Sequence, residues 1–80
     1  MHIAVDISLY PLSQQYIPPI QDFIRRLNGQ PGLRVETNAL STHVSGDIDR
    51  VFEALRVEVG RTFSELGRAV FVMKVLGGGD

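Results

Sequence analysis

The order in which strand-like and helix-like segments follow one another constrains this chain more than any other feature. Within residues 1–10, apolar side chains occupy every second position, at Ile3, Val5, Ile7 and Leu9. This period of two is typical of a half-buried strand. Pro11 ends the strand because proline has no N–H to donate to a neighbouring strand.

A helix is predicted next, over residues 15–28, because its apolar side chains recur at helical spacing. Pro18 and Pro19 then lie in the first turn, where a missing N–H costs nothing. We expect Asn28-Gly29 to end this helix through a left-handed residue.

The middle of the chain alternates again, over residues 33–38 and 39–45, which predicts a hairpin that bends near Asn38-Ala39. A second helix is predicted from Asp47, a favourable N-cap residue, to Leu66, with Gly67 just beyond its end. Gly60 lies inside this helix at a cost of about 1 kcal/mol relative to alanine. It indicates either close approach of a neighbouring backbone or no special role.

The last strand is predicted over residues 68–76, whose nearly continuous apolar run suggests that both of its faces are covered. Residues 77–80 are expected to form a flexible tail. The six elements predict one domain over residues 1–80.

That order is typical of the split βαβ, ferredoxin-like α+β fold. It predicts one antiparallel sheet of four strands with both helices on one face, and with the first and third strands in the centre. The residues expected beneath the helices are Ile3, Val5, Ile7, Leu33, Val35, Leu40, Thr42 and Val44.

The composition limits what can stabilise such a chain and what it can bind. A domain of 80 residues buries only about 60% of its unfolded surface. The chain has no cysteine and two histidines, which excludes disulfides and thiolate metal sites, so we expect no metal and no cofactor. Self-association into a homodimer or homotetramer is the expected supplement.

The charges are balanced, with 8 basic and 9 acidic residues, and this argues against nucleic acid as a partner. No apolar run reaches the length of a membrane-spanning helix, and no basic cluster suits a membrane surface. Because no signal-peptide pattern is visible, we expect a cytoplasmic location.

The sheet face away from the helices is predicted to carry Asp6, Ser8, Tyr10, Ser41, His43 and Ser45. The polar run over residues 37–43 suits a pocket for a small heterocycle, because its side chains both donate and accept hydrogen bonds. Alternatively, Asn38 and Ser41 shape a turn and the remaining side chains face water. Tyr10 and Tyr16 flank the first loop, where they either stack on a ring or simply pack.

Two ionisable residues on this face allow more than one interpretation. Asp6 either recognises a ligand or forms an ion pair with Arg34 or Lys74. His43 is a candidate base or metal ligand, but an ordinary surface histidine fits the pattern better. No nucleophile elbow, paired carboxylates or nucleotide loop occurs, so an enzyme is not expected.

Three segments resemble the thiamine-binding, YkoF-like family of ferredoxin-like domains. They are residues 6–12 (Asp-Ile-Ser-Leu-Tyr-Pro-Leu), residues 16–20 (Tyr-Ile-Pro-Pro-Ile) and residues 35–47, which contain Thr-Asn-Ala-Leu-Ser-Thr-His. The resemblance implies a non-catalytic, self-associating binder of thiamine or of its hydroxymethylpyrimidine part. The candidate ligand-binding residues are Asp6, Ser8, Tyr10, Asn38, Ser41, Thr42 and His43.

Two other functions remain open at this stage. One is a structural or regulatory oligomer whose open sheet face is buried between subunits and holds no ligand. The other is a dimeric α+β-barrel enzyme that uses His43 in a cleft between sheet and helices.

Overall fold

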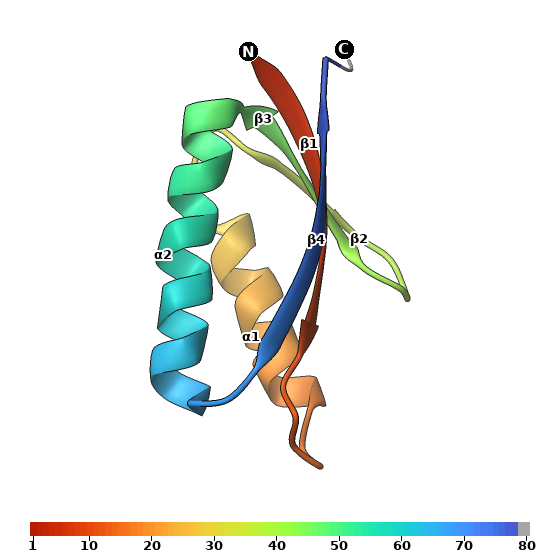
Figure 1. Ribbon diagram of the computed structural model, residues 1–80, viewed down its shortest axis with the longest axis vertical. Helices are drawn as coiled ribbons and strands as arrows, with labels where there is room; N and C mark the ends of the chain where they lie inside the picture. The colour runs from red at the N-terminus through yellow and green to blue at the C-terminus, as the bar shows by residue number, and fades with distance from the viewer. Residues whose placement is uncertain (79–80) are drawn as a thin grey trace.

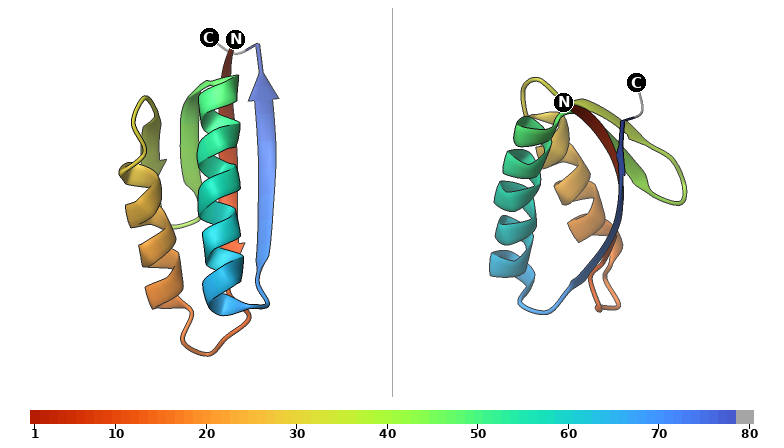
Figure 2. Two further views of the ribbon diagram at one scale, coloured as in Figure 1. Left: turned by 90° about the vertical axis from the view of Figure 1, so that its left-hand side faces the viewer. Right: turned by 45° about the horizontal axis from the view of Figure 1, so that its top comes forward.

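The computed structural model describes residues 1–78 and confirms the predicted ferredoxin-like α+β fold (Figure 1). One antiparallel sheet has the strand order β2-β3-β1-β4, so β1 and β3 are central as predicted. Both helices pack on the same face of this sheet (Figure 2). The elements are β1 (His2–Tyr10), α1 (Ile17–Asn28), β2 (Arg34–Thr37), β3 (Thr42–Asp47), α2 (Ile48–Leu66) and β4 (Val70–Gly77).

The core lies between the helices and the two central strands. The alternating side chains of β1 all point into it, and Val44 of β3 is fully buried beside them. Val35 on edge strand β2 and Leu33 just before it are only half-buried. Burial of these apolar side chains is the main favourable contribution to folding. The core residues are Ile3, Val5, Ile7, Leu9, Phe23, Leu27, Val44, Val51 and Leu55.

The prediction for Leu40 was wrong: its side chain is 88% exposed. Strand β3 begins at Thr42, three residues later than the alternation suggests, so Leu40 belongs to the hairpin loop. Asn38 shapes that loop, because its Oδ1 accepts hydrogen bonds from the backbone N–H groups of Leu40 and Ser41, at 2.8 and 3.0 Å. Its own N–H donates to the Ser41 carbonyl at 3.0 Å, which closes the bend.

The helix ends match the predictions with one exception. Asp47 caps α2 by accepting a hydrogen bond from the Asp49 N–H at 3.1 Å, and Gly67 follows its end with φ 79°. Gly29 was expected to be left-handed, but its φ is −81°. Its N–H reaches two helical carbonyls in a right-handed turn, and Gly32 supplies the positive φ instead, at 78°. Among the described residues outside its own stretch of helix, no atom lies within 4 Å of a Cβ placed on Gly60, so no other backbone segment of residues 1–78 approaches it closely.

Strand β4 also differs from the prediction, since neither of its faces is fully covered. It is an edge strand, and only Phe71 among its apolar side chains is half-buried. Its apolar run predicts a strand covered on both faces, but among the described residues it pairs only with β1 and lies at the edge of the sheet. Gly77, assigned to the tail, is the last residue of β4, and residues 79–80 of that predicted tail lie outside the described residues.

The two helices are joined by a buried polar network around Arg26. Its guanidinium donates to Glu58 Oε1 at 2.6 Å, to Thr62 Oγ1 at 2.7 Å and to Asp22 Oδ2 at 2.9 Å. Arg26, Glu58 and Thr62 are all buried. Every charge in this network therefore has an opposite charge or a hydrogen-bonding group in contact, as burial requires.

Candidate functional site

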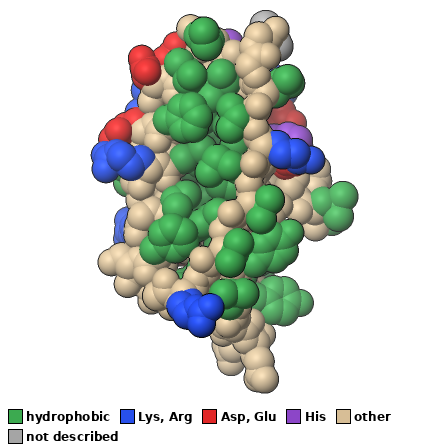
Figure 3. All heavy atoms as spheres, viewed as in Figure 1, with side chains coloured by type: hydrophobic (Ala, Val, Ile, Leu, Met, Phe, Trp, Pro, Cys, Tyr) green, Lys and Arg blue, Asp and Glu red, His purple; other side chains and the backbone are tan. Residues whose placement is uncertain are grey.

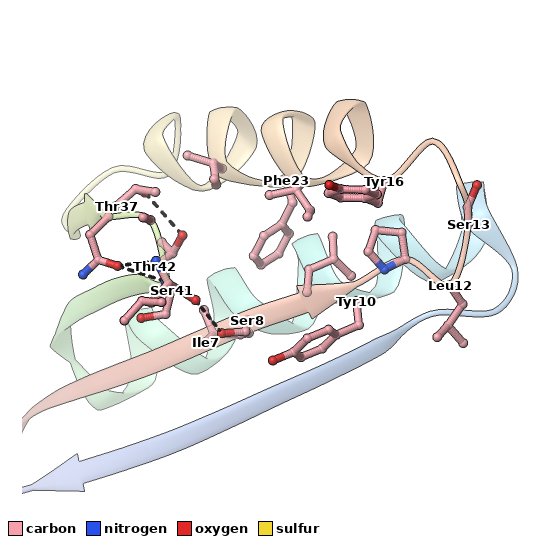
Figure 4. A pocket seen from close by; sticks show the side chains of 17 residues that line it. Ile7, Ser8, Tyr10, Leu12, Ser13, Tyr16, Phe23, Thr37, Ser41 and Thr42 are labelled. Carbon is pink, nitrogen blue, oxygen red and sulfur yellow. Dashed lines mark hydrogen bonds between the residues drawn. The ribbon is translucent and has the colours of Figure 1, made fainter.

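A cavity of about 460 Å³ lies where strand β1 runs past the end of β3. The last residue pair between these strands is Ile7–Thr42, whereas pairing between β1 and β4 continues to Tyr10–Val70. The stretch from Ser8 to Tyr10 therefore has no strand beside it on the β3 side. The cavity takes that place, between β1, α1 and the hairpin loop (Figure 4).

Aromatic and aliphatic side chains form most of the cavity wall. Phe23 lies at its base, with 2% of its surface exposed, while Tyr10 and Tyr16 lie at the rim and are both 53% exposed. Figure 4 shows Tyr16 and Tyr10 on different sides of the opening. Leu12, also at the rim, has a φ of 58°, a left-handed conformation that is unfavourable for a leucine by about 1–2 kcal/mol. Strained residues of this kind cluster at functional sites.

Hydroxyl and amide groups gather at the hairpin end of the cavity. The Ser8 hydroxyl donates to the Leu40 carbonyl at 3.4 Å, and the Oγ1 atoms of Thr37 and Thr42 lie 3.3 Å apart. Asn38 contributes its amide group from the same end. None of the 17 lining residues carries a charge. An apolar cavity with a few polar groups at one end is the usual form of a small-molecule site.

A second, more polar hollow lies on the open face of the sheet, and Asp6 is one of its lining residues. Its carboxylate is 3.7 Å from His43 Nε2 and 3.8 Å from Lys74 Nζ, the two residues that flank it on β3 and β4. The ion-pair interpretation therefore holds with Lys74. Arg34 instead contacts Glu36, at 2.7 Å.

The charge of Asp6 is favoured by its surroundings. The Ser41 hydroxyl is the main cause that holds the pKa of Asp6 below its ordinary value. The charges of His43 and Lys74 lower this pKa further, whereas burial raises it. Asp6 Oδ1 is buried, and no group among the described residues reaches it with hydrogen-bond geometry. Asp6 thus stays ionised well below neutral pH.

The structure separates the seven candidate residues into two groups. Four of them, Ser8, Tyr10, Asn38 and Ser41, line both the cavity and the open-face hollow. Thr42 lines only the cavity, and Asp6 and His43 lie only on the open face.

The candidate set omitted most of the apolar cavity wall. It does not contain Phe23, Leu12 or Tyr16, although Tyr16 is expected either to stack on a ring or simply to pack. Their place on the wall depends on how α1 packs over the end of β1, which residue spacing alone does not reveal. A tyrosine on each side of the first loop was the available signal.

The part of the chain that the structure describes holds no cluster of three or more metal-ligating side chains. Over residues 1–78, neither helix has the length and hydrophobicity needed to cross a membrane.

Solved structures with the same fold include three that cover nearly all of this chain. A protein from Streptococcus pneumoniae aligns at 20% identity and TM-score 0.91, over 99% of this chain and 89% of its own. A putative thiamine biosynthesis/salvage protein from Thermotoga maritima aligns at 15% identity and TM-score 0.72, over 95% and 83%. A domain of unknown function from Bacillus cereus aligns at 14% identity and TM-score 0.68, over 94% and 74%.

No curated protein matches the chain. The family described as "YKOF-related Family" matches residues 2–73, which is most of the sequence and includes β1, both helices, the hairpin and part of β4. This match agrees with the resemblance noted in the first strand and the hairpin. The chain belongs to the YKOF-related family.

Proposed function

We propose that this protein binds a small aromatic heterocycle of the thiamine or hydroxymethylpyrimidine type without transforming it, and that it works as a homo-oligomer. The observation that carries the proposal is the cavity of about 460 Å³ beside the free edge of β1. Its volume falls in the range of small-molecule sites. Family membership and the printed description of the Thermotoga maritima neighbour support the same ligand class.

The cavity offers an aminopyrimidine the groups that it needs. Such a ring has an amino donor and ring-nitrogen acceptors. The unpaired edge of β1 from Ser8 to Tyr10 presents backbone N–H and C=O groups toward the cavity, as any strand edge does. The hydroxyls of Ser8 and Ser41 lie nearby, and Tyr16 provides an aromatic surface for stacking.

Because the lining residues carry no charge, the cavity should favour neutral ligands over charged ones. A neutral pyrimidine fits without the cost of moving an ion out of water. In thiamine, the positively charged ring would lie toward the exposed rim, where Tyr10 and Tyr16 can contact a cation through their ring faces. A phosphate group would meet no compensating charge in the cavity wall.

Calorimetric titration with hydroxymethylpyrimidine, thiamine and thiamine phosphate tests the proposal. We expect binding of the first two and much weaker binding of the phosphate. Tyr16→Leu should weaken binding about tenfold or more, which corresponds to a loss of about 1.4 kcal/mol. Phe52→Leu, on α2 outside the cavity lining, is the matched control and should bind normally.

Absence of heat and of any thermal shift at millimolar ligand would sink the proposal, because binding to the folded state must raise its stability. Mass spectrometry of the ligand after long incubation checks the non-catalytic part. A chemically altered ligand would contradict it.

The second candidate is a structural oligomer without a ligand, and the exposed apolar surface of β4 favours it. The titration separates the two, since an oligomer that binds none of the three compounds supports only this second function. The barrel-type enzyme is disfavoured by geometry, because His43 lies on the open face and not between the sheet and the helices.

A further inference from the structure

Residues 12–16, here called the rim segment, follow β1 and line the cavity opening through Leu12, Ser13 and Tyr16. The whole segment is exposed, and its two large side chains, Leu12 and Tyr16, are 59% and 53% exposed. Figure 3 shows this part of the chain projecting at the lower end of the molecule, beyond the apolar side chains of α2 and β4. Because burial of apolar surface is favourable, Leu12 and Tyr16 would gain stability from any movement that covers them.

Few hydrogen bonds hold the rim segment in place. Among the described residues, its hydrogen bonds run from the Gln15 N–H to Ser13 Oγ at 3.2 Å and from the Ile20 N–H to the Tyr16 carbonyl at 3.4 Å. The first bond lies within the segment and moves with it, and the second is longer than a typical N–H···O bond. The segment can therefore move as a unit at the loss of one weak hydrogen bond.

The ends of the rim segment confine its movement. Pro11, just before it, is buried and so anchors the end of β1. At the other end Tyr16 is the N-cap residue of α1, and no side chain among the described residues caps the helix there. Pro18 and Pro19 fix the backbone of the first turn, because the proline ring restricts φ. The part of the chain that is free to move therefore ends where the prolines begin.

Leu12 supplies a hinge at the start of the rim segment. Among residues 1–78 it is the one residue other than glycine with a positive φ, at 58°. This backbone conformation is strained in a leucine, because its Cβ lies too close to the following carbonyl oxygen. Rotation of Leu12 to an extended conformation relieves that strain and at the same time moves the residues that follow it.

The opposite side of the cavity opening is fixed by comparison. Asn38 Oδ1 accepts hydrogen bonds from the N–H groups of Leu40 and Ser41 at 2.8 and 3.0 Å, and the Asn38 N–H donates to the Ser41 carbonyl at 3.0 Å. These three bonds hold the hairpin loop in one conformation. Of the two loops at the opening, the rim segment is therefore the one that can move.

We propose that the rim segment is a lid that closes over the cavity once a heterocycle has bound, with Leu12 as its hinge. The lid rests on the proposed function and adds a means of regulating the same site. Closure lays the Tyr16 ring against the ligand and buries the side chains of Leu12 and Tyr16, which are exposed in the open form described here. Because the ligand can leave only after the lid reopens, the lid sets the rate of dissociation.

The first experiment measures closure through a thiol, since the chain has no native cysteine. Leu12→Cys should react with a thiol reagent at least tenfold more slowly when hydroxymethylpyrimidine is saturating than when it is absent, because closure covers this position. Val57→Cys, exposed on α2 and outside the cavity lining, is the control and should react at one rate in both conditions. If Leu12→Cys fails to bind although the native chain binds, Ser13→Cys in the same segment replaces it.

Calorimetry on the same samples separates failure of the lid from failure of the proposed function. Heat of binding together with an unchanged thiol reaction rate would overturn the lid and leave the proposed function standing. Absence of heat in the native chain would overturn the proposed function, and the lid with it.

Two substitutions at the hinge test the release of strain. Leu12→Gly and Leu12→Ala both remove the leucine side chain, but glycine adopts a positive φ without strain and alanine does not. Leu12→Gly therefore loses a driving force for closure that Leu12→Ala keeps. Its dissociation constant for hydroxymethylpyrimidine should be at least about fivefold higher than that of Leu12→Ala. Equal dissociation constants for two folded variants, as checked by circular dichroism, would overturn Leu12 as the hinge.

Amide hydrogen exchange distinguishes closure over a ligand from cover by a second copy of the chain. At constant protein concentration, hydroxymethylpyrimidine should slow exchange in the rim segment and leave residues 29–33, a loop outside the cavity lining, unchanged. Exchange in the rim segment that slows with rising protein concentration in the absence of the compound would contradict the lid, because a second copy would then be what covers it.

Discussion

Arg26 is the residue whose surroundings depart most from what its type suggests. A guanidinium on a helix surface normally extends into water, yet this side chain is 5% exposed and contacts Asp22 and Glu58. Gln30 also donates to Glu58 Oε2, at 2.8 Å, so the carboxylate is held from two sides. The network fixes α1 against α2, and α1 in turn carries Tyr16 and Phe23 to the cavity.

Arg26→Ala should destabilise the protein by about 3–5 kcal/mol, because it leaves the Glu58 carboxylate buried without its partner. Urea unfolding followed by circular dichroism measures the change. Arg25→Ala is the neighbouring control; Arg25 is 70% exposed and pairs only with Asp22, so its loss should cost less than about 1 kcal/mol. Equal losses of stability in Arg26→Ala and Arg25→Ala would contradict the inference that burial makes the loss of Arg26 more destabilising.

At the scale of elements, the different lengths of β1 and β3 create the site. Strand β1 has nine residues and β3 has six, and the unmatched end of β1 is where the cavity lies. The hairpin loop forms one wall, and Asn38 holds that loop through two hydrogen bonds from backbone N–H groups. In the proposed function, loop conformation and ligand contact would therefore depend on the same residue.

Asn38→Ala should lower the free energy of unfolding by about 1 kcal/mol, the usual contribution of a lost hydrogen bond, and should also weaken ligand binding. Thermal unfolding and calorimetry measure the two effects. Asn28→Ala serves as the control, because Asn28 lies at the end of α1 and its amide donates to the Ile24 carbonyl at 2.9 Å, away from the cavity. That variant should lose a similar amount of stability with unchanged binding. Unchanged binding by Asn38→Ala would count against the hairpin loop as a cavity wall.

For the whole molecule, acidic side chains link stability to pH. The Arg25 and Arg26 hydrogen bonds hold the pKa of Asp22 below its ordinary value of 3.8, and the pKa of Asp6 is lowered chiefly by Ser41. In both cases the folded chain binds a proton less readily than the unfolded chain. The resulting stability is fully present above about pH 4 and is lost as the pH falls through the lowered pKa values.

Asp22 and Asp6 should therefore leave the urea concentration at the unfolding midpoint nearly constant between pH 7 and pH 5. This midpoint concentration should decrease when the pH is lowered beyond about 4. Asp22→Asn should have a shallower acid dependence than the native chain, at the cost of lower stability at pH 7. Urea titrations at a series of pH values measure both. A native chain as stable at pH 2 as at pH 6 would contradict the inferred charges.

The sequence predicts the elements well because their signals are local. Alternation in β1, the proline-rich start of α1 and the Asp47 cap all act over a few neighbouring residues. Leu40 was misplaced because alternation continues through the loop, and only the Asn38 side chain reveals the turn. Likewise, apolar content in β4 does not distinguish a strand covered by its own helices from one available to a partner. The cavity wall escaped prediction for a similar reason, since Phe23 reaches it only through tertiary packing.

The pairing of β1 with β4 joins residues that lie far apart in the sequence, with Ile3 opposite Gly77. During synthesis, β1 can pair with β3 as soon as the hairpin has left the ribosome, but its other edge stays open until residues 70–77 follow. Contacts so distant in sequence form slowly. The growing chain therefore leaves this edge of β1 unpaired while α2 is made, and the native sheet forms only once β4 is released.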